Sequence, residues 1–150
     1  MQFEVEVEIA ATPEKVWAAL INVVRWSEWT ASVTKVELQG GEHLALGSKV
    51  RIKQPHMPDL VWTITEFDPE HSFSWQNTNT GVTTIGSHMI KASTNNRVVA
   101  TFGISQSGIL APVIGILSSA RTKRYVNMEA LGLKRHCESD LENVADEEKP

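Results

Sequence analysis

The side chains that could carry out acid–base chemistry lie on two segments of this 150-residue chain. His88 lies in a run rich in β-branched residues, and Tyr125, the only tyrosine, lies in a helical pattern near the C-terminus. An inward-facing histidine can transfer a proton near neutral pH or hydrogen-bond a ligand carbonyl. The alternative for His88 is a core histidine held by a neighbouring side chain or by water.

Period-two alternation predicts the direction in which His88 points. Successive side chains of a strand face opposite sides, and Lys91, on the face opposite to His88, would be poorly placed in an interior. We therefore expect His88 to point inward. In the preceding strand Phe73 and Trp75 share a face, so the same alternation places Asn77 inward at the end of that strand.

Three polar residues of the C-terminal helical pattern could contact a polar group of a ligand. Tyr125 could present its hydroxyl while its ring lines a cavity wall. Arg121 or Arg124 could reach an anionic headgroup or an enolate. The alternatives are a tyrosine that points to solvent at the sheet edge and arginines on a solvated helix face.

Five tryptophans give the chain an aromatic content that could surround a flat ligand. Trp75, beside polar Asn77, is the first candidate for a pocket wall, and Trp62 is a second ligand-binding candidate. Core packing accounts for these rings nearly as well. The set consists of Trp17, Trp26, Trp29, Trp62 and Trp75.

Several other kinds of site are not expected. The five histidines show no paired spacing on one element, so we predict no metal site. No Gly-x-Ser-x-Gly elbow, glycine-rich phosphate loop or cysteine–histidine nucleophile arrangement occurs, so we predict no cofactor. The net charge is −4 and there is no block of lysine and arginine, which argues against a nucleic-acid partner.

The sequence also bears on location. The longest apolar run, residues 108–120, contains Pro112 and is shorter than the roughly 20 residues that cross a bilayer, so we expect no stable membrane insertion. Residues 1–9 alternate charged and apolar side chains, unlike a secretory signal. The single Cys137 excludes an internal disulfide. We expect a soluble, cytoplasmic protein.

The apolar pattern predicts the elements that must position these residues. Residues 3–9 alternate apolar and acidic side chains, which is typical of a half-solvated strand. A cap, a proline and an acid at 12–14 begin a helix that runs to about Val24, and a short helical turn follows at 25–29. Further strands are expected at about 33–39, 47–54, 60–67, 72–77, 82–92 and 97–105, with spacing that suits antiparallel hairpins.

The last part of the chain predicts one long helix. Apolar residues recur at helical spacing from Ala111 to about Ser139, a length of about 43 Å. Residues 140–150 form an acidic tail that we expect to be disordered. The prediction is an α+β fold: one domain, 1–139, whose seven-stranded curved antiparallel sheet wraps around the C-terminal helix, with two short helices after the first strand. The loop at 55–58, stiffened by two prolines, either gates a cavity or simply connects two strands.

The chain resembles the START/Bet v 1-like (SRPBCC) superfamily, specifically its polyketide cyclase/dehydrase and lipid-transport branch. The motifs that carry the resemblance span most of residues 3–138: ATPEKVW at 11–17, WSEW at 26–29, LGSKV at 46–50, WTITEFDP at 62–69, FSW at 73–75 and GSH at 86–88. The resemblance implies a helix-grip fold with an internal cavity. Members bind lipids, sterols, polyketides or hormones, some catalyse cyclisation, and others bind protein partners.

Three functions are therefore open. The first is binding or carriage of a small hydrophobic molecule, such as a lipid, a polyketide or an aromatic compound. Its ligand-binding candidates are Trp62, Trp75, Asn77, His88, Arg121 and Tyr125. The second is an enzyme of the cyclase or dehydratase type, in which His88 acts as the acid/base and a second inward titratable group is needed. The third is a protein–protein module in which residues 109–117 dock another protein or a second copy, giving a homodimer.

Overall fold

The computed structural model describes the backbone of residues 1–147 and the side chains of residues 1–139. The elements in chain order are β1 (Gln2–Ile9), α1 (Pro13–Ile21), the 3₁₀ helix η1 (Val23–Glu28), β2 (Lys35–Gln39), β3 (Lys49–Lys53), β4 (Leu60–Asp68), β5 (Ser72–Asn79), β6 (Val82–Ala92), β7 (Val98–Ser107) and α2 (Ala111–Glu147).

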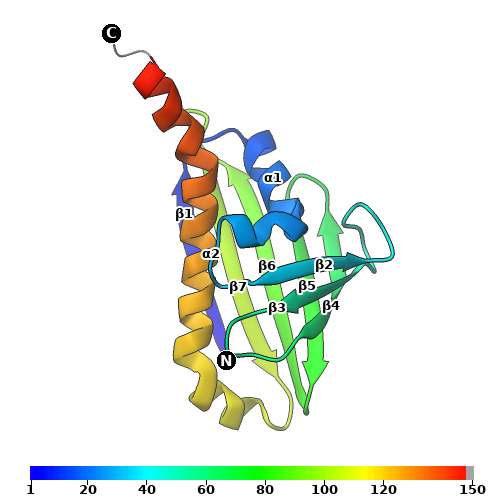
Figure 1. The fold of residues 1–150 in the computed structure, drawn as a ribbon. Coiled ribbons are helices and arrows are strands. Elements are labelled where there is room, and N and C mark those ends of the chain that lie inside the picture. Colours follow the sequence, from blue (N-terminus) through cyan, green and yellow to red (C-terminus); the bar gives the residue numbers. More distant parts are fainter. Residues whose placement is uncertain (148–150) are drawn as a thin grey trace.

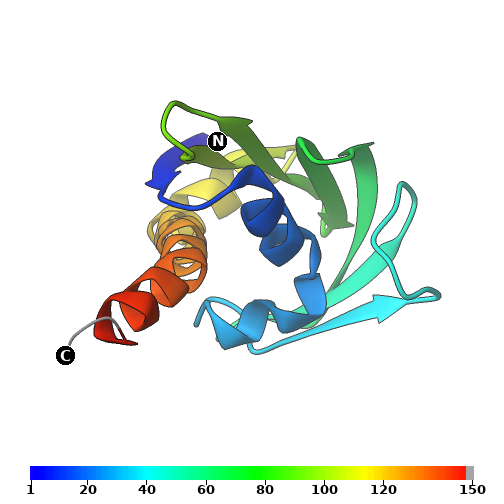
Figure 2. The same cartoon turned by 90° about the horizontal axis from the view of Figure 1, so that it is seen from above.

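The strands form one antiparallel sheet in the order β1-β7-β6-β5-β4-β3-β2. The sheet curls, and α2, α1 and η1 lie along its open, concave side (Figures 1 and 2). The predicted fold class, a seven-stranded curved sheet around a long C-terminal helix, is confirmed. The interior between these layers holds the largest fully buried side chains, among them Trp26, Phe73 and Phe102.

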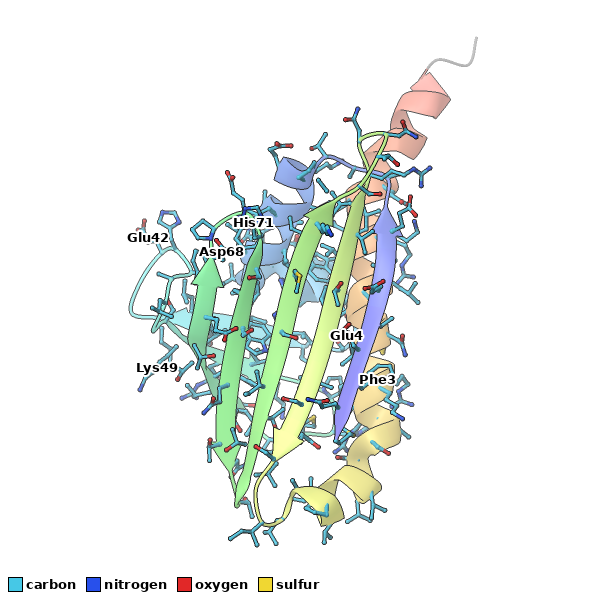
Figure 3. All side chains as sticks on the ribbon, turned by 180° about the vertical axis from the view of Figure 1, so that it is seen from behind. Phe3, Glu4, Glu42, Lys49, Asp68 and His71 are labelled. Atoms are coloured by element: carbon cyan, nitrogen blue, oxygen red, sulfur yellow. The ribbon has the colours of Figure 1, made fainter. Side chains whose placement is uncertain are left out.

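The local sequence accounts for the first two elements. In β1 every second residue faces inward, so carboxylates such as that of Glu4 lie on the convex side, which faces the viewer in Figure 3. The helix α1 begins as predicted, because the Thr12 hydroxyl accepts a hydrogen bond from the Lys15 backbone N–H at 3.3 Å and Pro13 opens the first turn.

Two helix ends differ from the prediction. The first helix ends at Ile21, not near Val24, because the Trp26 indole N–H donates to the Leu20 carbonyl at 2.9 Å and so satisfies one of the unpaired carbonyls of a helix end. The chain then tightens into η1. At the other end α2 continues to Glu147, so residues 140–147 of the predicted disordered tail are helical, and residues 148–150 lie outside the described residues.

A glycine sets the distance between α2 and the end of η1. A Cβ atom built on Gly132 would lie 2.2 Å from the Trp29 carbonyl oxygen. Elsewhere in the same helix, a Cβ on Gly115 would meet nothing closer than 3.7 Å, at Met1. The close approach at Gly132 therefore allows α2 to pack against the aromatic cluster around Trp26.

We predict that Gly132→Ala lowers the free energy of unfolding by about 1–3 kcal/mol, because the new methyl group must push helix and loop apart. This loss should occur although alanine favours helices over glycine by up to about 1 kcal/mol. Gly115→Ala is the matched control and should be neutral or stabilising. Urea unfolding measures both, and equal stability of the two variants would contradict the close approach.

Candidate functional site

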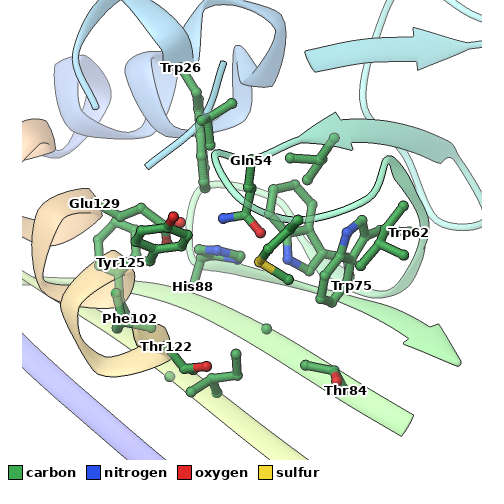
Figure 4. Close-up of a pocket in the computed structure, with 18 of the residues that line it drawn as sticks. Trp26, Gln54, Trp62, Trp75, Thr84, His88, Phe102, Thr122, Tyr125 and Glu129 are labelled. Atoms are coloured by element: carbon green, nitrogen blue, oxygen red, sulfur yellow. The ribbon is translucent and has the colours of Figure 1, made fainter. Parts of the chain in front are cut away.

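A cavity of about 110 Å³ lies between α2 and the concave face of the sheet (Figure 4). Its walls are mainly aromatic and aliphatic, with a few polar side chains facing in. A cavity needs roughly 10–15 Å³ on this measure to hold one water, so this one has room for several waters or a ring-sized molecule. The polar side chains on its lining are Gln54, Thr84, His88, Gln106, Arg121, Thr122, Tyr125 and Glu129.

Five of the six ligand-binding candidates line this cavity, namely Trp62, Trp75, His88, Arg121 and Tyr125. Asn77 does not. Its side-chain amide donates to the Val61 carbonyl at 2.8 Å, beyond the point where the pairing of β4 with β5 ends at Thr63 and Gln76. Period-two alternation gave the correct face of the strand, since the cross-strand neighbour of Asn77, Thr84, lines the cavity. The Asn77 amide nevertheless binds the Val61 carbonyl, which the pairing of β4 with β5 leaves unused.

His88 faces inward, as predicted, and is only 3% exposed. Its Nδ1 lies 3.3 Å from the Phe73 carbonyl oxygen. A carbonyl can only accept, so in the neutral ring Nδ1 carries the proton and Nε2 is left as an acceptor. Burial lowers the pKa of His88 to about 3, and the Phe73 carbonyl opposes this only in part, so the ring is neutral at pH 7. Four rings enclose it: Trp26, Phe73, Trp75 and Phe102.

Glu129 is a cavity residue that the sequence analysis missed. Ser32 Oγ donates to Glu129 Oε1 at 3.3 Å, and the Ser32 hydroxyl in turn pairs with that of Thr30 at 2.8 Å. Burial raises the pKa of Glu129 to about 7, while the Ser32 hydrogen bond acts in the opposite direction. The residue as a whole stays partly accessible through the cavity. Its spacing of four from Tyr125 puts it on the same helix face, which was the available signal.

Two buried polar atoms on the cavity lining have no hydrogen-bond partner within the described residues. One is the indole nitrogen of Trp62, a donor, and the other is Oε1 of Gln106, an acceptor. Leaving a buried polar group unpaired costs about 1–3 kcal/mol. Two side chains of the cavity lining therefore each contain a buried polar atom, one donor and one acceptor, that the chain itself does not satisfy.

The loop between β3 and β4 closes one side of the cavity. The Tyr125 hydroxyl donates to the Pro55 carbonyl at 2.7 Å, and Arg121 Nη1 donates to the His56 carbonyl at 3.4 Å. Met57 of this loop lines the cavity. The hydroxyl predicted to reach a ligand is thus engaged with the loop. We call residues 54–58 the closing loop.

Within the described residues, no three His, Cys, Asp or Glu side chains gather as a metal ion would need. No helix in that part of the chain is long and apolar enough to cross a membrane.

The curved seven-stranded sheet around a long C-terminal helix, with a cavity between them, is the helix-grip arrangement that the resemblance to START-like proteins predicted. The family model described as "Polyketide cyclase / dehydrase and lipid transport" matches residues 1–138, and the chain belongs to this family, as the sequence motifs predicted. No curated protein sequence matches the chain significantly.

Solved structures share the fold. The ZhuI aromatase/cyclase of Streptomyces sp. R1128 is 17% identical, with a TM-score of 0.76, covering 94% of this chain and 95% of that one. A hypothetical protein of Helicobacter pylori is 15% identical, with a TM-score of 0.76 and coverages of 91% and 86%. A START superfamily protein of Mycobacterium smegmatis is 10% identical, with a TM-score of 0.72 and coverages of 92% and 97%. At such identities the likeness concerns the fold.

We predict that Glu129 makes stability fall as pH rises. Between its ordinary pKa of 4.5 and about 7, the folded protein holds a proton that the unfolded chain has released. The contribution is therefore complete below pH 4.5 and is lost as pH rises through about 7, by about 3 kcal/mol in total. Glu129→Gln should remove this slope.

Urea unfolding of both proteins from pH 5 to 8 checks this. His88 contributes the opposite trend, a loss of stability as pH falls from about 6.5 towards 3, but it is present in both proteins and cancels in the difference. If the difference in stability between the two proteins does not change with pH, the Glu129 carboxyl is solvated and the prediction is wrong.

Proposed function

We propose that the protein binds a small, mainly apolar molecule that carries a flat ring and a hydrogen-bonding group. The observation that carries this proposal is the pair of unpaired buried atoms, Trp62 Nε1 and Gln106 Oε1, on one cavity lining. Native proteins pair nearly all their buried polar groups. Both exceptions among the described residues belong to side chains that line a single cavity, where a small side-chain movement on binding would bring them to a ligand acceptor and a ligand donor.

The aromatic walls support a flat ligand. Trp75 and Trp26 lie 5.2 Å apart between ring centroids, and Trp62 lies 6.0 Å from Trp75. Rings at these separations pack on one another and form a continuous aromatic wall, against which a ligand ring can stack. In this proposal His88, neutral and with Nε2 free to accept, favours a ligand hydroxyl over a ligand anion. The family description and the aromatase/cyclase neighbour agree with such a ligand.

The size of the cavity sets a condition on the ligand. A cavity of about 150 Å³ in another protein binds benzene, so the present 110 Å³ suits about one ring. A lipid or a multi-ring polyketide needs more room and enters only if the closing loop moves. The two hydrogen bonds from Tyr125 and Arg121 to this loop are then the contacts that must break.

We predict that Trp62→Phe weakens ligand binding about 5–10-fold, because it keeps most of the ring but removes the N–H donor. Native mass spectrometry with extraction of protein purified from its own host would first identify the bound molecule. Calorimetric titration would then compare the dissociation constants. Trp17→Phe is the control, since Trp17 packs on Phe67 and Phe73 away from the cavity. Equal affinities in both variants, or no ligand at all, would overturn the proposal.

A second candidate function is acid–base conversion of the bound molecule. A carboxyl group with a pKa of about 7 is suited to proton transfer at neutral pH, whereas His88 with a pKa of about 3 is a weak acceptor. Glu129 thus supplies the second titratable group that a cyclase or dehydratase requires. In a dehydration its carboxylate would take a proton from the carbon next to a ligand carbonyl and return it to the departing hydroxyl, which leaves as water.

For this second candidate we predict that Glu129→Gln reduces turnover 10²–10⁴-fold and changes ligand affinity only a few-fold. His88→Asn, which keeps a donor for the Phe73 carbonyl, should reduce turnover much less. Mass spectrometry of the ligand after incubation measures both. Turnover by Glu129→Gln at the normal rate would exclude this role, and a ligand recovered unchanged from the native protein would leave carriage as the function.

A further inference from the structure

The beginning of α2 and the turn before it expose an unusual set of large apolar side chains. Ile109 is 93% exposed, and Ile116 and Leu117 are each 82% exposed. Val113 is more than half exposed, and Leu110 is exposed to a lesser extent. We call these five residues the apolar tip. On the opposite face of the helix Ala111 and Gly115 are buried, so the sheet-facing side of this segment is already occupied.

The apolar tip is held in place against the sheet. Gly108 packs so tightly on the turn between β5 and β6 that a Cβ atom there would lie 2.3 Å from the Gly81 carbonyl oxygen. The Leu110 side chain lies over Gly81 as well. The start of α2 is next to this turn at one end of the molecule (Figure 1). Because the backbone at Gly108 is packed against this turn, the segment that carries the tip has little room to shift and bury its exposed residues.

The charge around the tip differs from that of the protein as a whole. The chain carries a net charge of −4, yet residues 105–128 contain no Asp or Glu and include Arg121, Lys123 and Arg124. None of these three cations forms an ion pair with a carboxylate of residues 1–139. Lys123 and Arg124 lie over aromatic rings instead, at 5.6 Å from Phe3 and 5.8 Å from Tyr125.

We propose that the apolar tip docks reversibly on an anionic lipid bilayer. Its five side chains would enter the headgroup region, and the exposed Lys123 and Arg124 would lie against lipid phosphates, whereas Arg121 stays on the closing loop. Apolar side chains flanked by lysine and arginine bind at such interfaces without crossing the bilayer. Each cation near an anionic membrane surface strengthens binding about fivefold.

A bilayer fits this surface better than a second copy of the chain. A symmetric dimer uses the same patch on both subunits, so it would bring two copies of the unneutralised pair Lys123 and Arg124 to one contact. The tip is also small, because a standard protein interface uses about 20–30 residues on each side. A fluid lipid surface needs no complementary shape and carries the opposite charge.

Vesicle flotation tests the proposal without any ligand, so its failure would leave the ligand-binding proposal intact. The wild-type protein should float with vesicles of phosphatidylcholine mixed with phosphatidylglycerol, and much less with phosphatidylcholine alone. The bound fraction on mixed vesicles should fall as salt is raised. The double variant Ile116→Ser/Leu117→Ser should lose at least tenfold in partition coefficient. Lys123→Gln/Arg124→Gln should lose about 25-fold on mixed vesicles.

Leu131→Ser is the matched control. Leu131 is 54% exposed on the same helix but lies outside the tip, so this variant should bind as the wild type does. Circular dichroism on heating verifies that every variant is folded. Failure of the wild type to float, or an equal loss in Leu131→Ser, would overturn the proposal. A dimer would also overturn it, if sedimentation equilibrium shows that Ile116→Ser/Leu117→Ser dissociates the dimer and the wild type does not bind vesicles. The tip would then be an interface between two copies of the chain.

Discussion

Burial of one indole ring, that of Trp26, links most parts of this structure. Its N–H ends α1 on the Leu20 carbonyl, and the ring is fully buried. It contacts the ring of Trp29, just after η1, and rings of β5, β6 and β7, namely Trp75, His88 and Phe102. A buried tryptophan removes a large apolar surface from water and also needs a partner for its N–H. The position of Trp26 thus fixes where α1 ends, where η1 lies and where one wall of the cavity lies.

The same apolar surroundings set the protonation of the cavity. Burial disfavours the charged form of any group, so it raises the pKa of Glu129 and lowers that of His88. Both groups are neutral in mildly acidic solution. The full positive charge on the lining is that of Arg121, which is directed to the closing loop. A neutral ligand therefore meets a cavity interior that is largely uncharged, whereas an anion would have to lose its hydration and compete with the closing loop for Arg121.

The fold was predictable from the sequence because alternation and capping are local signals. The alternation of β1 and the cap at Thr12 each depend on a few neighbouring residues. The direction of His88 was predictable for the same reason. Asn77 was misplaced because its partner, the Val61 carbonyl, is exposed only where two strands diverge, and this follows from tertiary packing. Glu129 was missed because a helical glutamate usually faces solvent, and nothing local shows that Ser32 is packed against it.

At neutral pH the two unpaired atoms and the buried Glu129 carboxyl, which begins to ionise there, reduce the stability of the empty protein, and all three residues line one cavity. A ligand that satisfies them stabilises the folded state by mass action. A carrier and an enzyme differ in what these contacts stabilise, which is the bound ligand itself in a carrier and the transition state of its conversion in an enzyme. A carrier gains affinity when Trp62 and Gln106 pair with the resting molecule. An enzyme gains rate only from contacts that strengthen in the transition state. Glu129 fits the second case, because its hydrogen bond from Ser32 is long at 3.3 Å and supports the carboxylate only weakly before a reaction.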